Sequence, residues 1–182
     1  MPVMTRRAVL AAVPASVVAC GEIAVLSQDE INASVAASRR LMFETVPWSR
    51  DLASRASGIL IIPEVVEGGF VISAAYGEGA LLIGDAPVDY MSMTSAAFGF
   101  QIGAQAFSHA LFFMTPEVLR EFRVTDGWEL GVDAEFAVPD QGIGAGISSN
   151  TVGRPVVALI YGQRGLIAGA SFEGTKYSRL IR

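Results

Sequence analysis

The chain contains few of the side chains on which catalysis and metal binding depend. Its 182 residues include one histidine and one cysteine, and 13 basic residues stand against 18 acidic ones. Such a chain cannot assemble the His/Cys clusters of metal sites, and its net charge of −5 comes without a basic stripe for nucleic acid. No uninterrupted apolar run reaches the roughly 18 residues that a membrane-spanning helix needs. We therefore expect no metal, no cofactor and no nucleic-acid partner.

Candidate catalytic residues are equally scarce. The single histidine, His109, lies among phenylalanine and leucine in a predicted strand, where a histidine is more often part of the core than a base. Ser171 lacks the spacing and the following helix of a hydrolase nucleophile. The glycine-rich run 142–146 has no lysine, so it is predicted to be a turn instead of a phosphate loop. Asp133 and Glu135 lie on one face of a predicted strand, which indicates a solvent-exposed face more than a calcium site. The sequence therefore predicts a protein that is not an enzyme.

The first 20 residues have the pattern of a bacterial export signal. Arg6 and Arg7 precede a short apolar stretch at 8–18, which is followed by Ala19 and Cys20. A basic start, a hydrophobic middle and small residues before a cleavage site are typical of a secretory signal. The end of this one resembles the lipobox, at which a cysteine receives lipid; an alanine-rich helix with an incidental cysteine is the alternative. The paired arginines favour twin-arginine export, with the Sec route as the alternative.

A lipid-modified Cys20 defines the expected organisation and location. The predicted divisions are a signal peptide at 1–19, an anchor segment at 20–26 and one domain at 27–182. Loss of the signal peptide leaves 11 basic and 18 acidic residues, a net charge of −7. Several acyl chains, at about 0.8 kcal/mol per buried CH₂, hold a protein stably on a membrane. We expect a membrane-anchored lipoprotein that faces the periplasm, and Gly21 favours the outer membrane over the inner one.

Helix signals lie mainly at the start of the domain. Ser27 and Glu30 form a capping-box pattern at the start of a predicted helix at 27–46. A proline follows it, and a second short helix is predicted at 48–56. A third helix is predicted at 116–123, after a threonine cap and with a proline in its first position.

From Gly58 onward the pattern changes to strands. Many apolar segments joined by short turns, without alternating helices, predict an α+β fold with N-terminal helices packed on a mostly antiparallel sheet. Glycines within the strands favour a strongly curved, barrel-like sheet. Residues 163–165 are predicted to form a hairpin turn and 139–155 a long loop. The predicted strands are 59–62, 70–76, 80–83, 90–97, 98–113, 128–137, 156–161 and 166–172.

Two glycines, Gly77 and Gly79, flank Glu78 inside an apolar strand pattern. Glycine weakens a strand, so its presence here indicates a bend, a bulge or close backbone approach, with a merely curved sheet as the alternative. Glu78 is predicted to be buried, with its carboxylate accepting backbone N–H bonds in the bend. Ligand contact is the alternative role for this carboxylate.

Three blocks of sequence together resemble one family. The first block begins with Ile59 to Pro63 and continues through Gly68, Gly69 and Phe70 to Tyr76, Gly77, Glu78 and Gly79. The second block is Phe98 to Gln105, which includes Gly103. The third block is Gly165 to Gly174, which includes Gly169. In order and spacing, from about Met42 to Lys176, the chain resembles the SYLF domain family. Members of this family bind lipid in bacterial envelope proteins and in eukaryotic membrane and endocytic proteins. The resemblance implies a non-enzymatic domain whose partner is lipid or a membrane surface.

The resemblance does not carry over every ligand of the family. Eukaryotic members bind phosphoinositides and fungal members bind actin. This chain has Glu67 where the family often has a basic residue, so phosphoinositide binding is not expected, and actin is not expected as a partner of an exported bacterial protein. An envelope protein is the alternative partner to lipid. Lipid or membrane contact is expected around the second predicted helix, where the alternative role is packing on the sheet. The residues expected to make this contact are Phe43, Val46, Trp48, Arg50, Leu52 and Arg55.

Overall fold

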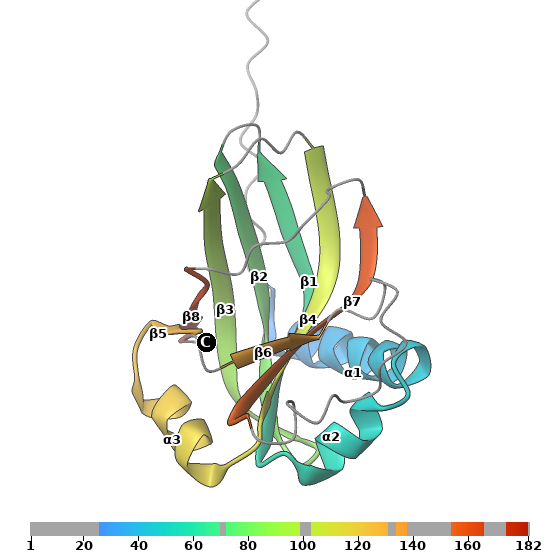
Figure 1. The fold of residues 1–182 in the computed structure, drawn as a ribbon, viewed down its shortest axis with the longest axis vertical. Coiled ribbons are helices and arrows are strands. Elements are labelled where there is room, and N and C mark those ends of the chain that lie inside the picture. The colour runs from blue at the N-terminus through green and yellow to red at the C-terminus, as the bar shows by residue number, and fades with distance from the viewer. Residues whose placement is uncertain are drawn as a thin grey trace, which may run out of the picture.

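The structure, a computed structural model, describes six stretches of the chain. These are residues 26–69, 72–98, 103–130, 134–137, 154–165 and 174–181. They form an α+β domain in which helices pack on one large sheet, as predicted (Figure 1).

Three helices and eight strands make up the described residues. In chain order they are α1 (Gln28–Thr45), α2 (Ser49–Arg55), β1 (Gly58–Gly69), β2 (Ile72–Ile83), β3 (Ala86–Phe98), β4 (Gly103–Phe113), α3 (Pro116–Val124), β5 (Trp128–Glu129), β6 (Ala134–Ala137), β7 (Val156–Gly165) and β8 (Lys176–Arg179). Within these stretches, no helix combines the length and the apolar character needed to cross a membrane.

The helices begin where their capping residues predict. At the start of α1, the backbone N–H of Ser27 donates to Glu30 Oε2 at 2.7 Å, and the Glu30 N–H donates to Ser27 Oγ at 3.3 Å. This reciprocal pair is the predicted capping box. At the start of α3, Thr115 Oγ1 accepts a hydrogen bond from the N–H of Val118, and Pro116 occupies the first turn. Local polar groups therefore fix both boundaries.

Several strand predictions need correction. The segments predicted as two strands at 70–76 and 80–83 belong to one continuous strand, β2. The segment predicted as one strand at 128–137 divides into β5, which pairs with β8, and β6, which pairs with β7 at the opposite end of the sheet. The predicted turn at 163–165 is wrong, because these residues lie in β7. The predicted strand at 166–172 and most of the predicted loop at 139–155 lie outside the described residues.

The sheet is strongly curved but open. Its strand order is β5-β8-β3-β2-β1-β4-β7-β6, antiparallel except for the β6–β7 pair. β4 and β8 are four strand spacings apart, about 19 Å along a flat sheet. Nevertheless His109 Nε2 on β4 lies 2.7 Å from the hydroxyl of Tyr177 on β8, which requires the sheet to curl over. Among the described strands the two ends do not pair, so the predicted barrel-like form holds for the curvature and not for closure.

Each face of the sheet carries its own core. On the outer face, α1 and α2 cover residues such as Ile61 and Leu82, and Ser38 of α1 shares a 2.8 Å hydrogen bond with the Tyr161 hydroxyl of β7. The inner, concave face is filled by side chains from β1 to β5, β7, β8 and α3, including Phe122. Figure 1 shows that the helices lie beside one half of the sheet, while β1 to β4 extend well beyond them.

A bulge at Pro63 reverses which side chains of β1 face outward. The pairing of β1 shifts between Ile61 and Glu64 against β2, and between Ile62 and Val65 against β4. Consequently Val65 is buried in the inner core and Val66 faces outward. A β-bulge adds a residue to one strand only, so it changes the side on which every later residue of that strand lies.

The glycines opposite the bulge allow β1 and β2 to approach closely. A Cβ atom on Gly79 would lie 1.9 Å from the carbonyl oxygen of Ile61, and one on Gly77 would lie 2.6 Å from that of Glu64. Neither position accepts a side chain without movement of the backbone. Of the predicted alternatives at these two glycines, close backbone approach is the one that the structure shows, and the bulge lies opposite them on β1.

Candidate functional site

An apolar strip is exposed on the outer face of the sheet, near the N-terminal end of α1. It consists of Val66 on β1 with Ile72 and Tyr76 on β2, whose exposed fractions are 53%, 56% and 40%. Val66 and Tyr76 are directly opposite each other in the β1–β2 pairing. Ile72 lies on the same face of β2, four residues from Tyr76, so this face is a candidate surface for contact with another apolar body.

A groove lies between this strip and the start of α1. Its cavity volume is about 380 Å³. Its lining combines apolar side chains, among them Leu26 at the very start of the described chain, with two carboxylates. The lining residues are Leu26, Ile31, Ser34, Pro63, Glu64, Val66, Tyr76, Gly77 and Glu78.

Glu78 is placed differently from the prediction. It is half-buried, and its Oε1 accepts a hydrogen bond of 2.7 Å from the hydroxyl of Tyr76, two residues away on the same strand face. The predicted burial in a backbone bend is therefore wrong. Successive residues of a strand point to opposite faces of the sheet. The Glu78 side chain therefore lies on the outer face with Ile72 and Tyr76 and lines the groove, whereas Gly77 and Gly79 take the inward positions.

Two of the residues predicted to contact lipid are core residues. Val46 and Leu52 are each 1% exposed and belong to the core between the helices and the sheet. Both side chains therefore take the alternative role, packing on the sheet, and neither is available to a membrane. The amphipathic pattern of the helices does not show which of their apolar faces the sheet covers.

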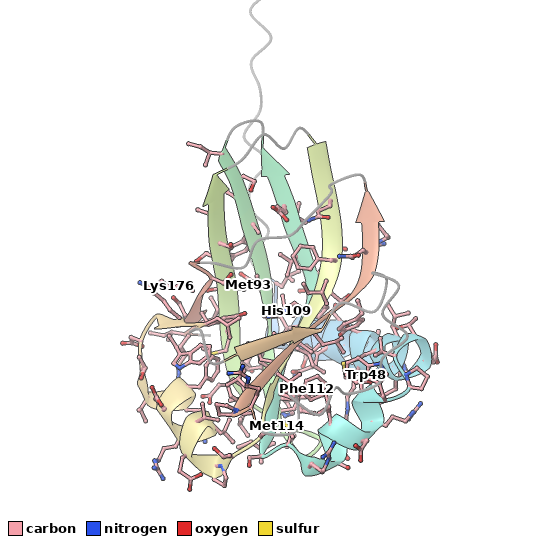
Figure 2. All side chains as sticks on the ribbon, in the orientation of Figure 1. Trp48, Met93, His109, Phe112, Met114 and Lys176 are labelled. Carbon is pink, nitrogen blue, oxygen red and sulfur yellow. The ribbon has the colours of Figure 1, made fainter. Side chains whose placement is uncertain are left out.

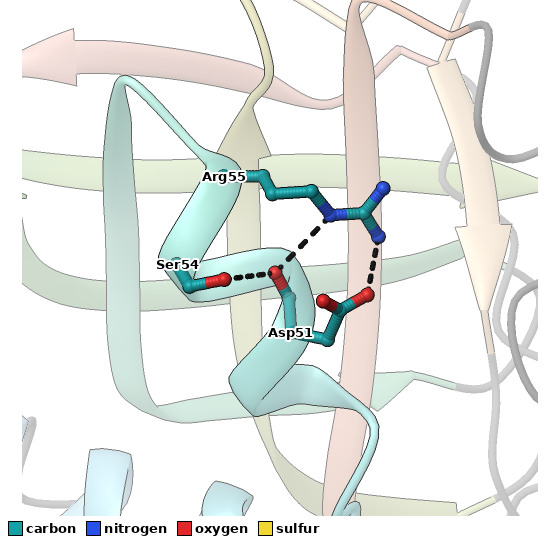
Figure 3. Close-up of polar contacts among 3 residues, drawn as sticks. All are labelled: Asp51, Ser54 and Arg55. Atoms are coloured by element: carbon teal, nitrogen blue, oxygen red, sulfur yellow. Dashed lines mark hydrogen bonds and ion pairs between the residues drawn. The ribbon is translucent and has the colours of Figure 1, made fainter.

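The other four predicted contact residues reach the surface around α2. Phe43 and Trp48 are partly buried against the same core, and the guanidinium of Arg50 lies 4.7 Å from the centre of the Phe43 ring. Arg55 donates from Nε to the carbonyl oxygen of Asp51 at 3.3 Å and forms an ion pair with its carboxylate at 2.5 Å (Figure 3). Lipid contact by these four residues stays a prediction.

His109 is a structural residue of the concave core. It lies at the centre of the packed side chains (Figure 2) and is completely buried. Burial lowers the pKa of His109 to about 4, against the raising effect of a hydrogen bond with the backbone of Leu159. The ring is therefore neutral at pH 7. It has no access to a substrate, since Tyr177, itself buried, occupies its Nε2.

Glu67 is also buried on the concave side, at 5% exposure. Its Oε2 accepts a 2.6 Å hydrogen bond from the side-chain amide of Gln105, its neighbour on β4. The bulge at Pro63 turns this residue inward. The position that departs from the family pattern is thus an interior one, and it does not supply surface charge for a headgroup.

A second surface pocket, of about 500 Å³, lies beside α3 and contains three arginines. Two of them bind the same carboxylate of the protein: Arg123 Nε lies 2.7 Å and Arg179 3.4 Å from Asp89 oxygens. This carboxylate offsets part of the positive charge. The residues that line the pocket are Pro116, Leu119, Arg120, Arg123, Val124 and Arg179.

The remaining predicted motif residues have mixed outcomes. Gly68 and Gly69 end β1, Gly103 begins β4 and Gly165 ends β7. Gly174 has a φ of +75° just before β8, a conformation that favours glycine. Gly169 and the predicted lipidation site, Cys20, lie outside the described residues.

Among the described residues, the concave face carries a packed core and the pockets lie at the surface. Residues 94–179, from β3 to β8, match the family model of Ysc84, described as a Las17-binding protein actin regulator. This match confirms, over residues 94–179, the resemblance to the SYLF domain family drawn from the sequence blocks. No curated protein matches the chain.

Proposed function

We propose that this chain is an exported lipoprotein whose SYLF domain binds lipid at its surface and catalyses no reaction. Its acylated Cys20 holds it on a membrane facing the periplasm, with the outer membrane favoured. The observation that carries the proposal is the exposed strip of Val66, Ile72 and Tyr76 beside the groove. The strip lies next to Leu26, only six residues after Cys20 in the sequence.

The free energy gained by covering the exposed apolar strip suits a protein that is already tethered to a membrane. Fully burying one large apolar side chain contributes about 1.5–3 kcal/mol. The three side chains of the strip are about half exposed, so covering them contributes roughly 3 kcal/mol in total. This is weak for a protein in solution. It is sufficient beside a membrane to which the chain is already anchored, because the second contact is then intramolecular.

The packing of the interior supports surface contact instead of an enclosed lipid. Phe122 lies 5.2 Å, ring centre to ring centre, from Trp128 and 4.6 Å from Phe113. In the stretches that the structure describes, these aromatic side chains and the buried His109–Tyr177 pair pack against one another on the concave face of the sheet. A lipid that binds this domain is therefore expected to meet its outer face.

A protein partner is the second candidate function. The family description names a protein that binds Las17, and the pocket beside α3 includes Val124, which is 76% exposed. An envelope protein docked there would need no lipid. This alternative predicts that the domain ignores lipid vesicles.

The test uses the mature chain, residues 20–182, with Cys20→Ser to prevent acylation. Every described helix and strand lies within residues 28–179, so this form keeps the whole fold. We expect the purified protein to float with vesicles of native envelope lipid at millimolar lipid concentration. Complete failure to float, together with no lipid found by extraction and mass spectrometry, would favour the protein-docking alternative.

A further inference from the structure

The pocket beside α3 carries an excess of positive charge in a chain that is acidic as a whole. Arg120, Arg123 and Arg179 are three of its six lining residues, and no carboxylate of the described residues lines it. Arg123 and Arg179 both pair with Asp89, at 2.7 Å and 3.4 Å. Arg120 makes no hydrogen bond or ion pair with any residue that the structure describes. Three guanidinium groups are therefore offset by one carboxylate among the contacts of the pocket.

The ion pairs with Asp89 leave donors of both arginines available. Arg123 binds the carboxylate through Nε, so its two terminal amino groups keep their capacity to donate. Arg179 donates to the carbonyl oxygen of Arg123 at 2.5 Å, which fixes its guanidinium against α3. The Asp89 side chain is only 9% exposed, so it is enclosed by these contacts. Because a guanidinium presents its donors in a planar fork, this arrangement can bind a second, external carboxylate and keep the first.

Two carboxylates of α3 lie beside the pocket without lining it. Glu117 and Glu121 are exposed, and neither forms an ion pair with a described residue. The lining residues of α3 form one stripe along the helix, and these glutamates lie next to its edge. Their charge repels an acidic ligand on that side. The site for such a ligand is thereby confined to the stripe of arginines.

The pocket and the apolar strip lie on opposite faces of the sheet. Leu119 and Phe122 of α3 pack into the core on the concave face, whereas Val66 and Tyr76 of the strip are exposed on the outer face. Figure 1 shows α3 beside β5 and β8, apart from α1 and α2. When the outer face meets a membrane, this pocket therefore opens to the aqueous side. A headgroup of that membrane is a poor occupant, and a protein is a better one.

Val124 gives the pocket an apolar edge. This residue is 76% exposed at the end of α3 and lines the pocket with Pro116 and Leu119. A free phosphate makes no use of such side chains, whereas a protein segment can cover them. Arginine is enriched in protein interfaces, where its stem packs on apolar groups and its head binds carboxylates. Charge and apolar surface together indicate a segment in which acidic side chains lie next to an aliphatic one.

We propose that this pocket binds an acidic segment of a protein partner, on the side of the domain that faces away from the apolar strip. One carboxylate of the segment accepts charge-assisted hydrogen bonds from Arg120, and another accepts them from the terminal amino groups of Arg123. An aliphatic side chain beside them covers Val124. The inference gives the chemistry of the protein partner named as the second candidate function, and it does not depend on lipid binding by the outer face.

The experiment measures peptide binding by fluorescence anisotropy, with the mature chain carrying Cys20→Ser, at about 0.1 M salt. The probe is a dye-labelled peptide that alternates glutamate and leucine, and its counterpart has glutamine in place of glutamate. We expect the glutamate peptide to bind at least about tenfold tighter than its counterpart. Arg120→Gln should weaken that binding about fivefold, the upper range for one exposed ion pair. Raising the salt to about 0.5 M should weaken it as well.

The matched control is Arg40→Gln, which removes an arginine that is likewise exposed on a helix and without a described partner. It should bind the glutamate peptide like the unchanged protein. Val124→Ser, at an exposed position, should weaken binding by a smaller factor than Arg120→Gln. Equal binding of the two peptides, or equal effects of Arg120→Gln and Arg40→Gln, would overturn the inference.

Two competitors separate a protein segment from other anions. Phosphatidylglycerol vesicles and inorganic phosphate, each at the same total negative charge as the peptide, should not displace it. Displacement by either would assign the pocket to a phosphate group and overturn the inference. A dimer that forms at raised protein concentration and is lost in Arg120→Gln would overturn it in favour of a second copy of this chain. None of these results changes flotation of the unchanged protein with vesicles, so the proposed lipid binding is tested separately.

Discussion

Acid should destabilise this domain through one buried side chain. His109 is completely buried and bonded to the Tyr177 hydroxyl, and burial lowers its pKa from 6.5 to about 4. As the pH falls below 6.5, the unfolded chain takes up the proton first, and the folded chain does so only near pH 4. Folding stability therefore falls through this window, by about 1.4 kcal/mol per pH unit. The total loss is about 3 kcal/mol, and it levels off below pH 4.

Urea unfolding at pH 7.5 and pH 4.5 measures this loss. The matched variant is His109→Gln, whose amide can still bond to Tyr177 but does not titrate. Carboxylates contribute to both proteins alike, and the chain has no other histidine. The unchanged protein should lose about 2–3 kcal/mol more than the variant between the two pH values. Equal losses would show that His109 is not kept neutral by its surroundings.

Three further substitutions test the packing and the helices. Gly79→Ala places a Cβ 1.9 Å from the Ile61 carbonyl oxygen and should lower the free energy of unfolding by at least about 2 kcal/mol. The control, Gly84→Ala, has open space at φ +63° and should cost about 1 kcal/mol. Similar melting temperatures for the two variants would contradict the close approach. Ser27→Ala removes the capping box and should lower the free energy of unfolding by about 1 kcal/mol in urea titrations, and no change would mean that α1 needs no cap. Trp48→Ala is expected to weaken vesicle partition; an unchanged partition coefficient would assign Trp48 to the core alone.

The parts of the fold that were predicted correctly have local signals. The capping box of Ser27 and Glu30 and the threonine-proline start of α3 involve residues within one turn, so the sequence contains the whole interaction. The glycines around Glu78 were informative for a similar reason. A residue without a Cβ inside an apolar strand has few explanations, and close backbone approach is one of them.

The parts that were missed depend on pairing between distant segments. β5 and β6 are only four residues apart, yet they pair with β8 and β7 at opposite ends of the sheet. Nothing in the sequence 128–137 marks this division. The short strand β8 is equally hard to predict from the sequence, because its four residues become a strand only through pairing with β3 and β5.

The candidate site was missed because of one inserted residue. Simple alternation from Ile59 places Val65 and Glu67 outward and Val66 inward. The bulge at Pro63 reverses all three, burying Glu67 and exposing Val66 opposite Tyr76. A proline in the middle of a strand was the available signal, since proline within a sheet is tolerated at edges and bulges. Burial of Val46 and Leu52 likewise depends on which face of each helix the sheet covers.

The most direct test asks which surface of the anchored domain meets the membrane. In the mature chain with Cys20→Ser, a single cysteine is introduced at one of two valines, Val66→Cys in the exposed strip or Val124→Cys on α3, and labelled with a polarity-sensitive fluorophore. Both positions are more than half exposed, so both accept the label. With vesicles of native envelope lipid, the label at position 66 should shift to the blue and be quenched by lipid-borne quenchers, while the label at 124 stays unchanged. A shift at position 124 alone, or at neither position, would contradict lipid binding through the outer face of β1 and β2.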